Sequence, residues 1–377
     1  MDDRDNERVR IGIVGCAEIA RKLCRAIALT PNAVLQAVGS RSLDKAKFFA
    51  AENGLSSTGV RLYGSYKEIV EDPSVDAVYL PLPTSLHVQW AVAAARHKKH
   101  VLLEKPVALD TTQLDQILEA CSSNGVQFMD GTMWLHHPRT LSMRKLISNP
   151  QLFGYLDYVY SSSTFCAPPE FLESNIRVKP DLDSLGALGD LGWYSIGSIL
   201  WAVGYELPVS VMALPQITCN SAGVILACSA SLFWDRSPGC QEPTEPASAT
   251  RRTVATFHCS FMAHMSMDLT IIGSNGSIHV KDLAIPFEEN SASYEFTPLA
   301  KFVDLHIGWS AKPERTGILS EIPQEALMVQ EFASLVRDIK RKGLPPESKW
   351  PEISRKTQLV LDAVKKSIDL GYSPVYL

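Results

Sequence analysis

The run Val101-Leu-Leu-Glu-Lys-Pro106 combines residue types that can place one ammonium group at the end of a β-strand. Its apolar start predicts a strand, and open parallel sheets bind ligands at the carboxyl ends of their strands. Glu104 can hold Lys105, and Pro106 restricts the turn that follows. A fixed ammonium can stabilise negative charge that develops on a substrate oxygen. The alternative is a solvated lysine at the start of a helix, which is common for exposed lysines.

A turn of small residues follows the first predicted strand. The segment Gly12-Ile-Val-Gly15-Cys-Ala17-Glu-Ile-Ala20 leaves a strand and opens a helix, which is the context of a phosphate-binding turn. Gly15 can form the tight turn, and Ala17 stands where the backbone approaches a pyrophosphate. Two of the three usual glycines are alanine here, so an ordinary strand-to-helix connection is the alternative. The turn predicts cofactor contacts from Gly12, Gly15, Ala17, Glu18 and Ile19.

The end of the second predicted strand bears on cofactor choice. NAD-selective proteins usually carry an acidic residue there, which holds the ribose 2′-hydroxyl. This chain has Gly39-Ser40-Arg41-Ser42 instead. Ser40 and Arg41, with Lys45, offer a hydroxyl and cations that suit a 2′-phosphate. The sequence therefore favours NADP(H) over NAD(H), with a solvated loop arginine as the alternative.

These residues need a scaffold, and the first third of the chain predicts one. Apolar runs of strand length alternate with amphipathic stretches, which predicts βαβ units and a doubly wound parallel sheet. The expected strands are Val9–Val14, Val34–Gly39, Ala77–Leu82, Val101–Leu103 and Gln127–Met129. The expected helices are Ile19–Leu29, Leu43–Ala51, Ser65–Glu71, Ser85–His97 and Thr111–Ser122.

The rest of the chain has a different pattern. Its strand-like stretches follow one another without regular helices, which predicts antiparallel pairing. Asn275-Gly276 is typical of a hairpin turn, and Phe233–Arg252 is rich in turn residues. The expected strands are Tyr155–Thr164, Val209–Leu214, Ile225–Leu232, Thr253–Cys259, Met265–Ile272 and Ser277–Val280.

The predicted fold class is α/β, with an N-terminal Rossmann sheet followed by an α/β domain that has a large, open, mostly antiparallel sheet. A length of 377 residues exceeds the usual size of one core. The expected domains are residues 1–131, for the dinucleotide, and residues 132–377, for substrate binding and oligomerisation. Whether the last helices pack back on the first domain is left open.

The composition of the chain is typical of a globular protein, and it excludes several kinds of partner. Hydrophobic residues make up 46% of the chain, charged residues 20%, and the formal charge is -5, so no basic field for nucleic acid is expected. The polar, acidic N-terminus lacks the pattern of a signal peptide, and no apolar run reaches membrane-spanning length. The eight cysteines form no C-x-x-C pair, which favours reduced thiols over zinc or disulfides. We expect a cytoplasmic protein with no metal, no nucleic acid partner and no membrane partner.

Several motifs together resemble one family. They are Gly12–Ala20, Pro81-Leu-Pro83-Thr84-Ser85-Leu86-His87, Val101–Pro106 and Gly186-Ala-Leu-Gly-Asp190-Leu-Gly192-Trp-Tyr194. In this order and spacing they resemble the Gfo/Idh/MocA oxidoreductases, and most of all uncharacterised plant members. The resemblance implies that Pro83, Thr84, His87, Glu104 and Lys105 contact the cofactor. It also implies a homodimer or higher homo-oligomer that pairs through the C-terminal sheet.

The same resemblance implies roles at the reacting carbon. The family's Glu-Lys-Pro lysine lies beside the nicotinamide and contacts the substrate oxygen, and Lys105 matches it. The acid–base residue comes from a D-x-G-x-(H/Y) motif, here Asp190 to Tyr194, and tyrosine resembles the branch with dimeric dihydrodiol dehydrogenase and glucose–fructose oxidoreductase. If Asp190–Val203 is a helix, Asp190 and Tyr194 share one face. A core aromatic is the alternative for Tyr194. Arg177 is either a contact to a polar or anionic substrate or a surface arginine.

The expected function follows from these roles. The chain is predicted to be an NADP(H)-dependent oxidoreductase that transfers a hydride between nicotinamide and a carbinol or carbonyl carbon of a sugar, polyol or dihydrodiol-like molecule. A general acid–base at Tyr194 and a cation at Lys105 suit that reaction. The alternatives are a catalytically silent NAD(P)-binding regulator and an enzyme that cleaves glycosides through a 3-keto sugar. Retention of Lys105, Asp190 and Tyr194 argues against the regulator.

Overall fold

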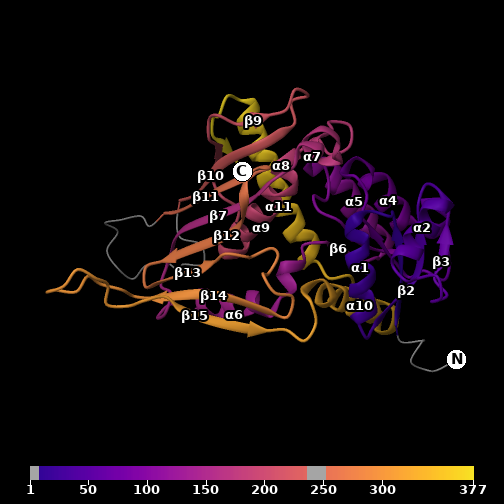
Figure 1. Cartoon of the computed structure of the whole chain (residues 1–377), viewed down its shortest axis with the longest axis horizontal. Helices are drawn as coiled ribbons and strands as arrows, with labels where there is room; N and C mark the ends of the chain where they lie inside the picture. The colour runs from indigo at the N-terminus through magenta and orange to yellow at the C-terminus, as the bar shows by residue number, and fades with distance from the viewer. Residues whose placement is uncertain (1–7, 236–251) are drawn as a thin grey trace. The chain divides into compact units, whose positions relative to one another are not determined.

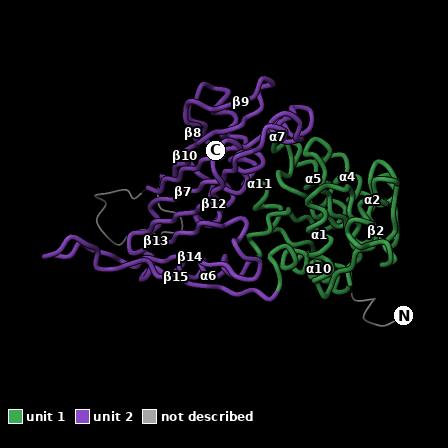
Figure 2. The backbone as a smooth tube through the Cα atoms, viewed as in Figure 1, with its two compact units in different colours: residues 1–136, 322–355 green, residues 137–321, 356–377 purple. Residues whose placement is uncertain are grey.

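The computed structural model describes residues 8–235 and 252–377, which form two compact units (Figures 1 and 2). The first unit comprises the chain up to His136 together with Ile322–Arg355, and the second comprises His137–Glu321 and Lys356–Leu377. Most of the turn-rich segment at 233–252, with Cys240, lies outside the described residues, as does most of the acidic N-terminus. No helix of the described residues is both long and apolar enough to cross a membrane.

The first unit is built on a parallel sheet of six strands in the order β3-β2-β1-β4-β5-β6. This confirms the predicted doubly wound sheet, and the order reverses between β1 and β4, where such sheets bind ligands. The short strand β3 was not predicted, because its three residues include no fully buried apolar side chain. The strands are β1 (Val9–Val14), β2 (Ala33–Gly39), β3 (Arg61–Tyr63), β4 (Ala77–Leu80), β5 (His100–Leu103) and β6 (Phe128–Asp130).

Helices of the first unit begin where the sequence supplies a cap. Ser42, Ser65 and Asp110 each accept a hydrogen bond from a backbone N–H in the first turn of the helix that follows. The helix expected at Ser85–His97 is a short 3-10 turn, η2 (Thr84–Leu86), followed by α4 (His87–Arg96). The other helices are α1 (Glu18–Leu29), α2 (Leu43–Glu52), α3 (Tyr66–Glu71), α5 (Thr111–Asn124), η3 (Met133–His136) and α10 (Gln324–Lys342).

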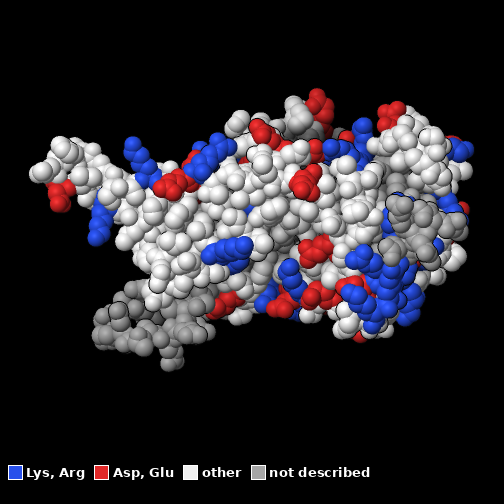
Figure 3. All heavy atoms as spheres, turned by 90° about the horizontal axis from the view of Figure 1, so that it is seen from below, with Lys and Arg blue, Asp and Glu red and all other residues white. Residues whose placement is uncertain are grey.

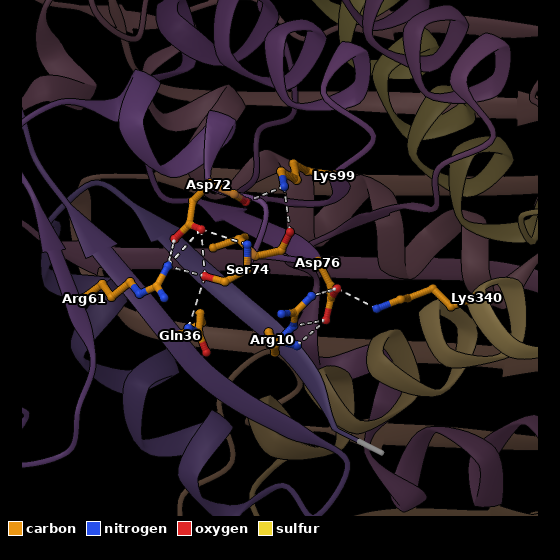
Figure 4. A network of polar contacts seen from close by, with 9 residues as sticks. Arg10, Gln36, Arg61, Asp72, Ser74, Asp76, Lys99 and Lys340 are labelled. Atoms are coloured by element: carbon orange, nitrogen blue, oxygen red, sulfur yellow. Dashed lines mark hydrogen bonds and ion pairs between the residues drawn. The ribbon is translucent and has the colours of Figure 1, made fainter. Parts of the chain in front are cut away.

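A polar network joins the amino-terminal edge of this sheet to α10 (Figure 4). Asp76 accepts hydrogen bonds from Arg10 Nη2 at 2.8 Å and from Lys340 Nζ at 2.5 Å. Burial opposes the charge of Asp76, but the hydrogen bonds from Arg10 and Lys340 outweigh it and lower its pKa to about 2. A second carboxylate, Asp72, accepts from Arg61 at 3.1 Å. The network lies at the opposite edge from the ligand-binding ends of the strands, so we assign it to stability.

We expect Asp76→Asn to lower the free energy of unfolding by about 1–3 kcal/mol at pH 7, because charged hydrogen bonds are lost. Since the folded-state pKa of Asp76 is depressed to about 2, its contribution is present above its usual pKa of 3.8 and is lost as pH falls toward 2. The difference between the proteins should therefore shrink at pH 3, as measured by urea denaturation. Asp115→Asn is the control, because Asp115 and its partner Arg355 are 47% and 44% exposed. Equal losses for both variants at pH 7 would contradict the assignment.

The second unit is built on a mixed sheet, whose described strands number ten. Its main path runs β15-β14-β13-β12-β7-β11-β10-β8-β16, and β9 pairs with β10. All pairs are antiparallel except β11 with β7, so the mostly antiparallel sheet is confirmed. The strands are β7 (Leu156–Cys166), β8 (Ser210–Ala213), β9 (Thr218–Cys219), β10 (Ile225–Trp234), β11 (Thr253–Ser260), β12 (Met262–Gly273), β13 (Gly276–Val280), β14 (Ser291–Pro298), β15 (Glu314–Leu319) and β16 (Val375–Tyr376).

The helix expected at Asp190–Val203 is divided in the structure. Asp190 ends α8 (Gly186–Asp190), and α9 (Gly192–Ala202) begins two positions later. Glycines at both ends of the break lower helix propensity, which favours a break here. Ser195 and Ser198 of α9 hydrogen-bond to serines of β7, so α9 packs directly on the sheet. The remaining helices are α6 (Pro138–Ile147), α7 (Pro169–Ser174), η4 (Ile176–Val178) and α11 (Lys349–Asp369), which passes from the first unit into the second.

Candidate active site

The predicted phosphate turn connects β1 to α1. Gly15 has φ +125°, and a Cβ there would lie 2.9 Å from Leu82 Cδ2, so the turn needs glycine and lies against the loop after β4. Ala17 caps α1 without a side-chain hydrogen bond, which leaves the first N–H groups of α1 without a side-chain cap. Such N–H groups bind phosphate well, and the residues present therefore fit a dinucleotide. Gly12 lies within β1, buried against Ile69 of α3.

The cofactor residues predicted around the ribose lie close together. Three of them, Ala17, Glu18 and Lys45, line a hollow of about 190 Å³ together with Cys16, Arg21 and Phe48, which were not predicted, whereas Ser40 and Arg41 are not among its lining residues. Ser40 is buried, and its backbone N–H donates to Tyr63 O at 3.2 Å. Arg41 is exposed, and its charge opposes the increase in the pKa of Tyr66 that burial causes.

Lys105 follows the carboxyl end of β5, as predicted, and the Lys105–Pro106 peptide bond is cis. The backbone N–H of Lys105 donates to Glu104 Oε2 at 3.2 Å. The other oxygen of Glu104 accepts from the Tyr79 hydroxyl at 2.5 Å. A Cβ on Gly131 would lie 2.9 Å from Glu104 Oε1, so the carboxylate fills the place of that missing side chain. Glu104 therefore contacts groups at or near the ends of β4, β5 and β6.

His87 lies beneath the turn that follows Lys105. Its Nε2 is 2.9 Å from Leu82 O, and its Nδ1 is 3.1 Å from Val107 O. Burial lowers the pKa of His87 to about 4, against the effect of these carbonyls, and keeps the imidazole neutral at pH 7. The ring is 1% exposed. The structure thus places His87 against two backbone carbonyls, while Pro83 and Thr84 form the start of η2 beside it.

The second unit holds the remaining predicted residues together. Arg177 Nε lies 2.8 Å from Asp190 Oδ1, and the two side chains are 34% and 9% exposed. Asp190 raises the pKa of Arg177 above its usual value, burial opposes the rise, and Asp183 and Tyr194 add to it. The Arg177 cation therefore lies near Asp190, and near enough to Asp183 and Tyr194 to feel their charge. Tyr194 is itself buried in α9.

Two hydrogen bonds hold the backbone around Arg177. Its backbone N–H donates to Asn175 Oδ1 at 3.0 Å, which caps η4. Asn220 Nδ2 donates to Val178 O at 2.9 Å, from the connection that follows β9. The sequence reasoning placed Arg177 near a polar or anionic substrate, and it did not identify Asp190 as the partner of the guanidinium.

Among the described residues no group of three or more His, Cys, Asp or Glu side chains is arranged to hold a metal ion. The polar atoms identified above are instead donors, acceptors and cations of the kind that bind phosphates and hydroxyl groups. The first unit, taken by itself, has a turn that fits a dinucleotide and the ammonium of Lys105. The second unit, taken by itself, has the phenol of Tyr194 in α9.

Comparison with known proteins finds similar oxidoreductases. Residues 9–132 match the model of an oxidoreductase family with a NAD-binding Rossmann fold, Gfo/Idh/MocA. An uncharacterized oxidoreductase of Rhizobium meliloti is 28% identical over 368 residues, which cover 96% of this chain and 98% of that protein. A dTDP-3,4-didehydro-2,6-dideoxy-alpha-D-glucose 3-reductase of Streptomyces violaceoruber is 34% identical over 225 residues, 59% of this chain and 62% of the reductase.

A solved structure extends the likeness of the fold to both units. A mutant of a 3-ketoreductase from Actinomadura kijaniata, in complex with TDP-benzene and NADP, has a TM-score of 0.73 at 22% identity. The match covers 95% of this chain and 97% of the reductase. This likeness is one of fold, and within the first unit residues 9–132 are the part that matches the family's Rossmann model. Together, the family match over residues 9–132 and the relatives show that the chain is similar to the Gfo/Idh/MocA oxidoreductases.

Proposed function

We propose that this protein is an NADP(H)-dependent oxidoreductase that interconverts a carbinol and a carbonyl carbon of a sugar, polyol or dihydrodiol-like molecule. The observation that carries the proposal is the position of Lys105 at the carboxyl end of β5, with its backbone held by Glu104, in a sheet whose first turn fits a dinucleotide. A bound nicotinamide would supply or accept the hydride. The relatives that carry out sugar chemistry add support for the substrate class. Turnover of Lys105→Met, treated in the Discussion, is the test.

Each proposed catalytic residue has a separate task. When the carbonyl is reduced, the Lys105 ammonium stabilises the oxyanion as its charge develops, and the Tyr194 phenol donates a proton to that oxygen. In the reverse direction the Tyr194 phenolate accepts the hydroxyl proton. Asp190, paired with Arg177, holds the guanidinium near Tyr194, so we assign Arg177 to the support of Tyr194 as well as to substrate contact. These roles follow from side-chain chemistry and from the resemblance to the family.

For the cofactor we propose that Arg41 binds the 2′-phosphate of NADP(H). Arg41 is exposed at the end of β2, where the chain has no acidic residue, and Lys45 lines the hollow beside Ala17. We expect Arg41→Ala to weaken NADPH binding by about 1–3 kcal/mol, or roughly tenfold or more, and to change NADH binding little. Fluorescence titrations of both proteins with each cofactor, without substrate, measure this. Equal losses for NADPH and NADH would overturn the assignment, and Arg96→Ala, at the far end of α4, is a control.

We also propose that the chain forms a homodimer or a larger homo-oligomer through the sheet of the second unit. The segment between β14 and β15 exposes Phe302, Leu305 and Trp309 by 84%, 88% and 66%, and its tip, at the left of Figure 3, is largely uncharged. Large apolar side chains of this kind bury ~150–250 Å² each, so a few approach the ~800 Å² per partner of a stable interface. Sedimentation of the full chain against a variant with these residues changed to serine tests this. A monomeric mass for both proteins would contradict it.

The cysteines bear on where in the cell the protein is located. We propose a cytoplasmic location, because the seven described cysteines are free, including Cys228 and Cys259, whose sulfur atoms lie 3.4 Å apart. Cell fractionation checks the location.

The placement in the dihydrodiol dehydrogenase branch rests on Tyr194 in the D-x-G-x-(H/Y) motif, and the plant origin stays a prediction. Activity with dihydrodiols, compared with aldoses, would test the branch.

A further inference from the structure

We propose that Tyr79 and His87 are positioning residues that hold the backbone of Lys105 from its two sides. The inference rests on the role of Lys105 in the proposed function, and it concerns residues of the first unit only. Neither residue is expected to touch the substrate, because both side chains are buried and their polar atoms face groups of the chain itself. Each acts through one intermediate group next to Lys105.

Tyr79 acts on the amino-terminal side of Lys105. It lies in β4, where its side chain is 0% exposed, and its hydroxyl donates to Glu104 Oε1 at 2.5 Å. Glu104 Oε2 accepts from the backbone N–H of Lys105 at 3.2 Å. One carboxylate thus joins a hydroxyl on β4 to the Lys105 backbone after β5. A hydrogen bond to a charged acceptor is roughly twice as strong as a neutral one, so removal of the hydroxyl should loosen the carboxylate.

His87 acts on the carboxyl-terminal side. It bridges the carbonyl oxygens of Leu82, after β4, and Val107, two residues beyond Lys105, at 2.9 and 3.1 Å. β4 and β5 are neighbours in the sheet, so the ring lies between the loops that leave two adjacent strands. A neutral imidazole donates one proton, so the ring makes one hydrogen bond at a time and occupies the space between the two carbonyls. The turn that carries Lys105 is held at both ends.

The expected consequence is kinetic. Lysine has a long flexible side chain, so its ammonium is placed only as well as the backbone from which it extends. A misplacement of ~1 Å at a reacting centre can cost ~100-fold in rate. We expect the affinity for the dinucleotide to come mainly from the turn after β1 and the end of β2, and only in small part from contacts near Lys105. A positioning residue for Lys105 should therefore lower kcat and leave cofactor affinity almost unchanged.

The decisive variant is Tyr79→Phe, which removes one oxygen atom and keeps the ring. We expect kcat to fall about 10- to 100-fold, with the Kd for NADPH within about threefold of the original. Tyr63→Phe is the matched control, since the Tyr63 hydroxyl donates to a different carboxylate, Asp72, at 2.8 Å in the same unit. Unchanged kcat in Tyr79→Phe, or an equal fall in Tyr63→Phe, would overturn the inference.

A double-mutant cycle tests the path through the carboxylate. If Tyr79 acts through Glu104, the Tyr79→Phe/Glu104→Gln protein should be no slower than the slower single variant. Losses in kcat that multiply would show that Tyr79 acts elsewhere. For His87, Gln retains a donor and Leu does not, so we expect His87→Gln to keep more kcat than His87→Leu. Equal kcat in those two variants would remove His87 from the proposal.

The two levels of proposal fail in different ways. If Lys105→Met retains full turnover, the proposed function fails and this inference fails with it. If Lys105→Met is inactive but Tyr79→Phe has the original kcat, only the inference about positioning fails. Because Tyr79→Phe leaves no large cavity, a folded protein is expected, and its thermal midpoint should be measured alongside kcat.

Discussion

Lys105→Met should reduce turnover at least ~1000-fold and leave the Kd for NADPH within about tenfold of the original. Methionine keeps much of the length of the lysine side chain but cannot stabilise the oxyanion, whose charge develops mainly in the transition state. An interaction made only there contributes to kcat and little to ground-state binding. Stopped-flow or steady-state rates, with fluorescence titration of NADPH in parallel, measure the two effects separately.

A matched control makes this result interpretable. Lys98→Met removes an exposed ammonium from the same unit. Lys98 precedes β5, and its ammonium donates a hydrogen bond to Asn124 O at 3.1 Å. We expect that variant to keep its turnover. Full activity in Lys105→Met would remove the ammonium from the mechanism. Loss of NADPH binding in step with turnover would make Lys105 a cofactor contact rather than a catalytic cation.

Tyr194→Phe should lower kcat at least ~100-fold, the lower end of the range for a general acid–base. Phenylalanine retains the ring that packs in α9 and removes only the hydroxyl, so the protein should stay folded. The proximity of the Arg177 cation supports a role in proton transfer, because a cation favours the phenolate that forms when the proton leaves. The pH dependence of kcat and the rate at saturating substrate are the measurements.

Tyr294→Phe serves as the control for Tyr194. Tyr294 is also buried in the second unit, and its hydroxyl lies 2.9 Å from Ser142 Oγ, so the same atom is removed from a comparable place. Its kcat should be unchanged. If Tyr194→Phe were as active as the original, water or Lys105 would have to donate the proton. If neither Lys105 nor Tyr194 mattered while NADPH still bound, the silent regulator would become the better interpretation.

Local sequence patterns were enough to predict the scaffold of both units. Strand-length apolar runs alternating with amphipathic stretches predicted five of the six strands of the first sheet, and β1 was predicted at Val9–Val14, the range observed. These signals are local, because the period of a strand or helix is written in consecutive residues. The strands β3, β9, β14, β15 and β16 were missed, since each has short or exposed apolar patterns that resemble loops.

For the candidate site, too, some features could be predicted from the sequence and others could not. Residue types at strand ends predicted Gly15 and Lys105 as functional positions, and a short motif that resembles the family's predicted Tyr194, because turns and motifs are also local in the chain. Only the tertiary structure decided that Tyr79 supports Glu104, that His87 bridges two loops, and that Arg177 pairs with Asp190. Those contacts join residues 5 to 25 positions apart, and their partners are chosen by the packing of separate elements. The one local sign of these contacts was Tyr79, a tyrosine in an apolar strand. Its buried hydroxyl needs a hydrogen-bond partner, and the sequence alone does not name that partner.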